Sequence, residues 1–188
     1  MDKKNILFSF FIVVFGVLFR LLLNETLAIP NFEAVTALSL VSGSLLGGFF
    51  SFLNPLLMMF FSDIQFGNTS IYLFTWPAFI LTGLLGTVIK RNCRTNQKGY
   101  FLKMTGAGIF SAVVFFIWTN FGWWLTSGMY PMNAQGLAAC YAAGLPFLKN
   151  QILSALIFVP FFSFVFSAAY DRLKSCSFAQ SKAEKIQL

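Results

Sequence analysis

Histidine is absent from the chain, and only six of its 188 residues are acidic. Histidine is the commonest general base and metal ligand, so its absence excludes a Ser-His triad and argues against a metal centre. The three cysteines, Cys93, Cys140 and Cys176, form no CxxC pair and indicate neither a zinc site nor a disulfide framework. No glycine-rich phosphate loop occurs. We therefore expect a protein that is not an enzyme, uses no metal or cofactor and does not hydrolyse ATP by itself.

Charge is scarce as well. Charged residues make up 10% of the chain and hydrophobic residues 57%, and the mean hydropathy is +0.75. A soluble domain would not carry so few charges, so the composition predicts an all-α, polytopic integral membrane protein in contact with the lipid bilayer. The net charge of +7 does not predict nucleic-acid binding. The basic residues lie mainly in predicted loops and the tail, where positive charge sets topology or contacts anionic lipid.

The apolar runs predict six transmembrane helices in one domain, residues 1–171, followed by a cytoplasmic tail, residues 172–188. Asn54-Pro55 predicts a turn inside the run 34–66, because the residue before proline is pushed away from helical geometry. Residues 134–147 are too few to cross and predict a re-entrant or interfacial half-helix before the last span. The expected spans are 6–23, 34–50, 54–64, 71–89, 101–125 and 150–170.

The basic residues predict the orientation. All of the 13 except Arg20 and Lys149 lie in the N-terminal segment, in residues 90–103 or in the tail. Placing these three segments in the cytoplasm satisfies the positive-inside rule and requires an even number of crossings. Both termini are then cytoplasmic, and Glu25, Glu33 and Asp63 lie on the outer side. Thr26 and Ala28 resemble a signal cleavage site, but the first apolar run is longer than a signal core, so we expect it to be retained.

Polar residues of the outer loops are candidate ligand contacts. Asn31 and Glu33 from one loop, with Asp63 and Asn68 from another, offer hydrogen bonds and negative charge. The alternative is that they cap helices and shape turns, positions that Asn and Asp favour. Arg20, roughly a turn from the outer end of its span, either extends to the lipid headgroups or pairs inside the bundle with Glu33 or Asp63.

The segment 118–130 is the richest in aromatic and polar groups. Three tryptophans and a tyrosine at one helix end are typical of a belt at the membrane–water interface. A belt has no use for amides, however, and rings with a few polar groups are typical of a small-molecule pocket. Tyr141, in the expected half-helix, is placed to close such a pocket. The predicted wall consists of Trp118, Asn120, Trp124, Tyr130, Asn133 and Tyr141.

Four segments carry a family resemblance. They are Pro30-Asn31-Phe32-Glu33-Ala34-Val35-Thr36-Ala37-Leu38, Ser62-Asp63 with Gly67, Asn120-Phe121-Gly122-x-Trp124-Leu125-Thr126-x-Gly128-Met129-Tyr130-Pro131, and Leu137-x-x-Cys140-Tyr141-x-x-x-Leu145-Pro146-Phe147. They resemble an uncharacterised family of bacterial six-helix membrane proteins. That family looks related to the substrate-binding S components of energy-coupling-factor (ECF) vitamin transporters.

The resemblance implies a six-helix bundle in the bacterial inner membrane that holds one small ligand near its outer face. It also implies partners, namely a membrane coupling subunit and two cytoplasmic ATPases. Many S components carry an Ala-x-x-x-Ala face on the first helix for docking the coupling subunit. Here only Gly16 is small between Ser9 and Arg20, and the nearest small-residue face is 42–48.

We therefore expect the substrate-binding subunit of an uptake transporter for a vitamin-like molecule or another micronutrient. The alternative is a membrane scaffold or assembly protein that binds a partner through its outer loops. A third hypothesis is a membrane enzyme with Asp63 or Glu33 as acid or base. The expected substrate-binding residues are Asn31, Glu33, Asp63, Asn68, Trp118, Asn120, Trp124, Tyr130, Asn133 and Tyr141.

Overall fold

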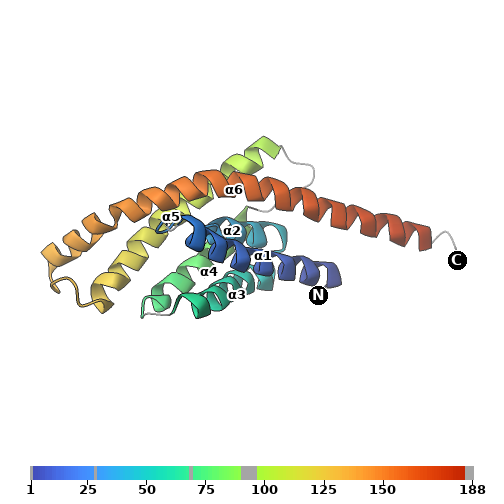
Figure 1. Ribbon diagram of the computed structural model, residues 1–188. Coiled ribbons are helices and arrows are strands. Elements are labelled where there is room, and N and C mark those ends of the chain that lie inside the picture. The colour runs from blue at the N-terminus through green and yellow to red at the C-terminus, as the bar shows by residue number, and fades with distance from the viewer. Residues whose placement is uncertain (1, 28, 68–69, 90–96, 185–188) are drawn as a thin grey trace.

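The computed structural model describes residues 2–27, 29–67, 70–89 and 97–184, and these residues form six helices and no strand. The expectation of an all-α bundle is confirmed. Consecutive helices run antiparallel (Figure 1). The helices are α1 (Lys3–Leu27), α2 (Val35–Leu45), α3 (Gly48–Phe66), α4 (Tyr72–Val88), α5 (Gln97–Thr126) and α6 (Ala134–Glu184).

The two ends of the bundle differ in charge. The start of α1, the end of α4 and the last part of α6 lie toward one end, which Figure 1 shows on the right. Lys4 Nζ donates a hydrogen bond to the carbonyl of Leu173 there, at 3.1 Å. We call this end the basic end, after Lys3, Lys4, Lys98, Arg172 and Lys174. The opposite end holds the α1–α2 loop and the facing ends of α3 and α4.

Helix α2 is the centre of the fold. Every residue from Val35 to Ser44 is buried, because α1, α3, α4, α5 and α6 all pack against this one short helix. A buried hydrogen-bond chain joins three helices at this centre. Ser9 Oγ of α1 donates to Asn54 Oδ1 of α3 at 2.6 Å, and Asn54 Nδ2 donates to Ser42 Oγ of α2 at 2.7 Å. Polar side chains satisfied in this way are favoured inside a membrane bundle.

Two glycines let α2 approach α4 closely. A Cβ built on Gly43 of α2 would overlap the carbonyl oxygen of Gly83 on α4, and one built on Gly86 would overlap that of Leu40. Only hydrogen fits at these points, as in small-xxx-small helix contacts. The small residues 42–48 are therefore used within the bundle.

This packing predicts the outcome of adding a methyl group. We expect Gly43→Ala to lower the free energy of unfolding by about 2 kcal/mol, since the new Cβ meets backbone, which relaxes poorly. Gly106→Ala in α5 is the matched control, because a Cβ at that position has open space. Thermal unfolding of both variants in detergent measures the difference, and equal melting temperatures would show that α2 and α4 are not packed this closely.

The predicted turn at Asn54-Pro55 is wrong. The reversal lies at Leu46 and Gly47, and α3 runs without a break from Gly48 through Pro55. Gly47 and Gly48 have φ of +64° and +50°, which glycine adopts without strain, so two successive glycines are the better site for the reversal. Proline is tolerated within a membrane helix where neighbouring helices surround the freed backbone groups.

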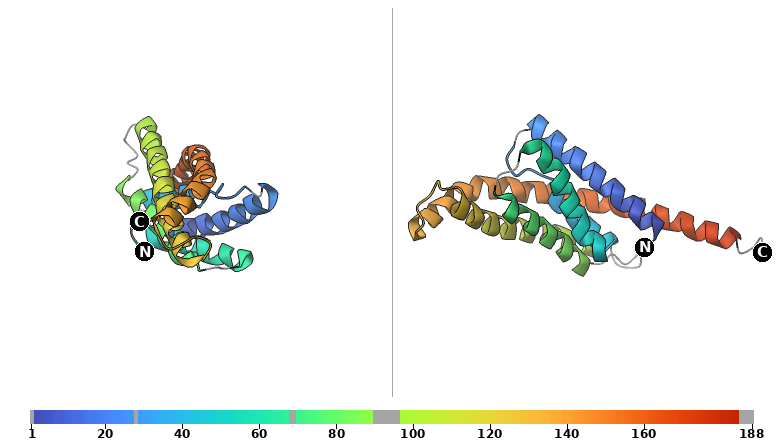
Figure 2. Two further views of the ribbon diagram at one scale, coloured as in Figure 1. Left: turned by 90° about the vertical axis from the view of Figure 1, so that its left-hand side faces the viewer. Right: turned by 90° about the horizontal axis from the view of Figure 1, so that it is seen from below.

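The predicted half-helix is also wrong. Residues 134–147 and the expected last span belong to one helix, α6, of 51 residues, which contains Pro146 and Pro160 and continues past residue 171 to Glu184. α5 supports the first part of α6 from the side, and the two helices project beyond the rest of the bundle as a hairpin (Figures 1 and 2). The first part of α6 packs along α5, so it does not need the several neighbouring helices that would surround a re-entrant segment.

Among the residues that the structure describes, four helical segments are long and apolar enough to cross a membrane, and these spans indicate a multi-pass membrane protein. They are Lys3–Leu27, Gly48–Phe66, Lys98–Thr126 and Ala134–Lys174. α2 and α4 are shorter. The 11 residues of α2 rise about 16 Å, but α2 is enclosed by other helices and does not need to match the thickness of the lipid.

Candidate functional site

A cavity of about 330 Å³ opens at the end of the bundle opposite the basic end. Its walls come from the last turns of α1 and α3, the α1–α2 loop and the beginning of α4, with Phe115 of α5 and Gln151 of α6 behind them. Polar and charged side chains from five segments of the chain meet there. They are Arg20, Asn24, Asn31, Glu33, Asp63, Thr75 and Gln151.

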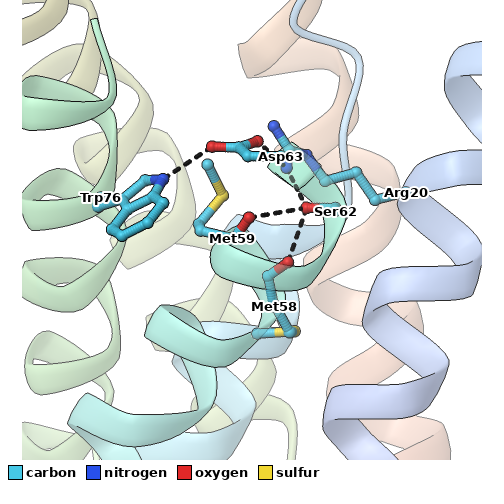
Figure 3. A network of polar contacts seen from close by, with 6 residues as sticks. All are labelled: Arg20, Met58, Met59, Ser62, Asp63 and Trp76. Carbon is cyan, nitrogen blue, oxygen red and sulfur yellow. Dashed lines mark hydrogen bonds and ion pairs between the residues drawn. The ribbon is translucent and has the colours of Figure 1, made fainter. Parts of the chain in front are cut away.

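An ion pair spans the cavity wall (Figure 3). Arg20 Nη1 of α1 lies 2.6 Å from Asp63 Oδ1 of α3 and also donates to Ser62 Oγ. Trp76 Nε1 of α4 donates to Asp63 Oδ2 at 2.7 Å, so both carboxylate oxygens have partners. Arg20 therefore pairs with Asp63, and the contacts join three helices. The side chains are only 20% and 10% exposed, and charges at such depth are stable only when paired.

Glu33 has a structural role in addition to its place in the cavity wall. Its two carboxylate oxygens accept hydrogen bonds from the backbone N and the Oγ1 of Thr36, at 3.0 and 2.5 Å, which satisfies the first turn of α2. Glu33 lies in the α1–α2 loop, outside the helices. Burial raises the pKa of its carboxyl above the ordinary value of 4.5, and the Thr36 hydrogen bonds and the charge of Arg20 only partly oppose this shift.

The raised pKa of Glu33 predicts how stability depends on pH. The folded protein holds this proton more tightly than the unfolded chain, so the free energy of unfolding falls as pH rises from 4.5 through the raised pKa. We expect Glu33→Gln to flatten this part of the profile of melting temperature against pH. Glu25→Gln, an exposed acid near the end of α1, is the control that should leave the profile unchanged. Parallel profiles for wild type and Glu33→Gln would contradict the assignment.

Gln151 has an unusual environment. Its side chain is 1% exposed and lines the cavity, yet its Oε1 has no hydrogen-bond partner among the described residues. A buried acceptor without a donor is unfavourable and uncommon. The neighbouring residue, Asn150, connects α6 to the α1–α2 loop, because its Nδ2 donates a hydrogen bond to the carbonyl of Pro30 at 3.0 Å. Asn31, next in the chain, has a φ of 58° and lies at the cavity rim.

The predicted aromatic wall does not line this cavity. Trp118 packs on Phe74, with ring centroids 5.5 Å apart. Trp124 Nε1 donates to the carbonyl of Pro131 at 3.0 Å, and Tyr141 hydroxyl donates to that of Ile117 at 2.8 Å. The first contact joins α5 to α4, and the other two hold the α5–α6 hairpin together. Tyr130 lies at its tip, half-buried.

The amides of the same region have helix-packing and capping roles. Asn120 Nδ2 donates to the carbonyl of Phe116 at 2.8 Å, and its Oδ1 lies where a side chain on Gly144 would have to be. Asn133 Oδ1 accepts from the backbone N of Gly136 at 2.8 Å, which makes it the N-cap of α6. Asn68 lies outside the described residues. The structure thus brings together Asn31, Glu33 and Asp63 from the predicted set, and it adds Arg20 and Gln151.

The comparisons with known proteins give one match. The family model for DUF6580, a family of unknown function, matches residues 1–177. The chain belongs to this family. The comparisons with curated proteins and with solved structures found no match. Membership of DUF6580 leaves the function to be argued from the site.

The acidic side chains of the cavity in this DUF6580 protein already have hydrogen-bond partners. Within the part of the chain that the structure describes, no three Cys, Asp or Glu side chains converge as metal ligands. The oxygens of both acids already accept hydrogen bonds, from Arg20, Trp76 and Thr36. Sequence reasoning did not select Gln151. The one available signal was a glutamine at the start of the last apolar run, directly after Asn150, since polar residues in membrane helices face inward.

Proposed function

We propose that this DUF6580 protein is the substrate-binding subunit of an uptake transporter for a small, vitamin-like molecule or another micronutrient. The cavity of about 330 Å³ carries the proposal, and its central feature is the buried, unpartnered amide oxygen of Gln151. Small-molecule sites are concave and combine apolar side chains with a few oriented polar groups, and this cavity has a mixed lining of both kinds. A ligand would supply the hydrogen-bond donor that Gln151 lacks.

The charge of the two ends supports capture from outside. The cavity lies opposite the basic end, and the positive-inside rule puts basic ends in the cytoplasm. The chain then crosses the membrane six times, with α2 and α4 as short crossings, and both termini lie in the cytoplasm of a bacterial cell. The cavity faces the outer side, where an importer meets its substrate.

The chain would depend on partners for energy. It contains no nucleotide-binding motif, which fits a subunit that works with a membrane coupling protein and two cytoplasmic ATPases, as the resemblance to ECF S components implies. The small residues 42–48 are not available for docking such a protein, since Gly43 already contacts α4. The exposed apolar side of α1, with Phe10, Val14 and Leu18, is the remaining surface on the first helix.

A retained ligand tests this function. We expect native mass spectrometry of the full chain, released from nanodiscs, to show a bound small molecule. Thr75→Phe, which fills the cavity, should abolish that mass difference. Thr87→Phe is the control on the same helix, because Thr87 is half-buried near the other end of α4 and does not line the cavity. A wild-type protein that binds nothing, or a Thr75→Phe variant that keeps its ligand, would contradict the proposal.

One observation favours the alternative function as a scaffold. Residues 104–148 contain no charged side chain, and the tip of the α5–α6 hairpin exposes Met129 and Met132, which are 69% and 63% exposed. Exposed apolar patches of this kind mark interaction surfaces. A scaffold would purify with a stoichiometric membrane partner and would show no response to a ligand. Substituting Met129 and Met132 with Ser would then release the partner.

A further inference from the structure

The hydrogen-bonding groups of the cavity restrict the chemistry of its ligand. Arg20 is the first of these groups. A guanidinium has five N–H donors, and Arg20 makes both of its hydrogen bonds to side chains in the described structure through Nη1 alone (Figure 3). The other nitrogens remain available in a side chain that lines the cavity. A fixed guanidinium with free donors is the side chain best suited to a carboxylate.

The acids of the cavity do not provide a cation site. Asp63 is neutralised by Arg20, and its second oxygen is held by Trp76. Both oxygens of Glu33 are held by Thr36, and burial disfavours its charged form. A cationic ligand would therefore find no free carboxylate in this part of the cavity. An anionic or neutral acceptor group, by contrast, has hydrogen-bond donors available on Arg20.

Gln151 sets the second requirement. Its Oε1 is a buried acceptor with no donor among the described residues, on the α6 side of the same cavity. A ligand that pairs this oxygen must carry an N–H or O–H group. The walls around these polar groups are apolar and partly aromatic, with Phe79 and Phe115 in ring contact at 4.9 Å. An apolar or planar body therefore fits between the two polar ends of the ligand.

We infer that the cavity binds a small carboxylate with an apolar or aromatic body and an N–H or O–H donor at its other end. Arg20 holds the carboxylate, and Gln151 accepts from the donor. This inference rests on the proposed function, since it names the class of molecule that the same site would capture. Arg20 and Gln151 then determine which ligand binds, and Asp63 positions Arg20.

Four small probes test the inference. They are 4-hydroxybenzoate, which has both groups, benzoate, which lacks the donor, 4-hydroxybenzamide, which lacks the charge, and tyramine, which replaces the anion by a cation. Melting temperatures of the full chain in nanodiscs, measured with each probe at about 10 mM, detect affinities in the millimolar range. We expect 4-hydroxybenzoate to bind roughly tenfold more tightly than benzoate or 4-hydroxybenzamide, and tyramine not to bind.

A variant separates the role of Gln151 from general stability. In Gln151→Leu, 4-hydroxybenzoate and benzoate should bind equally, because the acceptor that distinguishes them is gone. Stabilisation by tyramine, or by 4-hydroxybenzamide above 4-hydroxybenzoate, would overturn the ligand class while leaving the capture function intact. No response to any of the four probes would overturn the ligand class as well. The capture function fails separately, if native mass spectrometry of wild type shows no retained molecule.

Discussion

Asp63→Asn is expected to be the most destabilising of the substitutions considered. It removes the only carboxylate paired with Arg20 among the described residues, and it leaves a guanidinium in a largely buried site at the end of a membrane bundle. Breaking one side of such a pair costs about 3–5 kcal/mol, far more than the pair contributes relative to two apolar residues. The loss should appear as a large fall in melting temperature, and as a lower yield of folded protein.

The double variant Arg20→Leu/Asp63→Leu distinguishes the ion pair from the other contacts of Asp63. If the cost comes from an unpaired charge, removing both charges should restore much of the stability that either single change loses. Ser62 and Trp76 would still lose their partners, so recovery should be incomplete. A double variant that is as unstable as the sum of the two singles would show that Arg20 and Asp63 act independently.

Gln151→Leu is expected to change stability and binding in opposite directions. The substitution removes a buried acceptor that has no donor, so the ligand-free protein should gain about 1 kcal/mol or more of unfolding free energy. Capture of the retained ligand should fall at the same time, because the group that the ligand satisfies is gone. Gln151 would then reduce stability but support binding, as residues of functional sites do.

Ser163→Ala is the matched control for Gln151→Leu. Ser163 lies on the same helix, and its Oγ is likewise buried without a hydrogen-bond partner among the described residues, but it does not line the cavity. We expect Ser163→Ala to raise the free energy of unfolding without reducing the amount of retained ligand. Thermal unfolding and native mass spectrometry of the two variants provide the comparison. Loss of stability in Gln151→Leu, or equal ligand retention in both variants, would contradict the role given to Gln151.

The helical bundle and part of the cavity could be predicted from the sequence. Composition and long apolar runs determine a multi-pass helical protein, and charge predicted which residues share an end. That reasoning was enough to place Asn31, Glu33 and Asp63 together, because loops on one side of a bundle converge. It also offered Asp63 as a partner for Arg20, since charges within membrane helices face inward and pair.

What the sequence did not predict has physical causes. The role of Asn133 as the N-cap of α6 depends on backbone geometry, which one sequence does not determine. The chain reverses at Gly47 and not at Pro55. This reversal requires positive φ angles, which glycine adopts, whereas proline only removes a backbone N–H donor. Gln151 could not be assigned to the cavity, because its approach to Arg20 depends on how α6 packs across the bundle.

We propose that the Arg20–Gln151 cavity, and not the aromatic hairpin, holds the ligand. An experimental structure of the protein with its retained molecule tests this most directly. We expect ligand density within hydrogen-bonding distance of Gln151 Oε1 and of a free nitrogen of Arg20, with Asp63 still paired to Arg20. An empty cavity, with the ligand lying instead against Trp118, Trp124 and Tyr130, would contradict it.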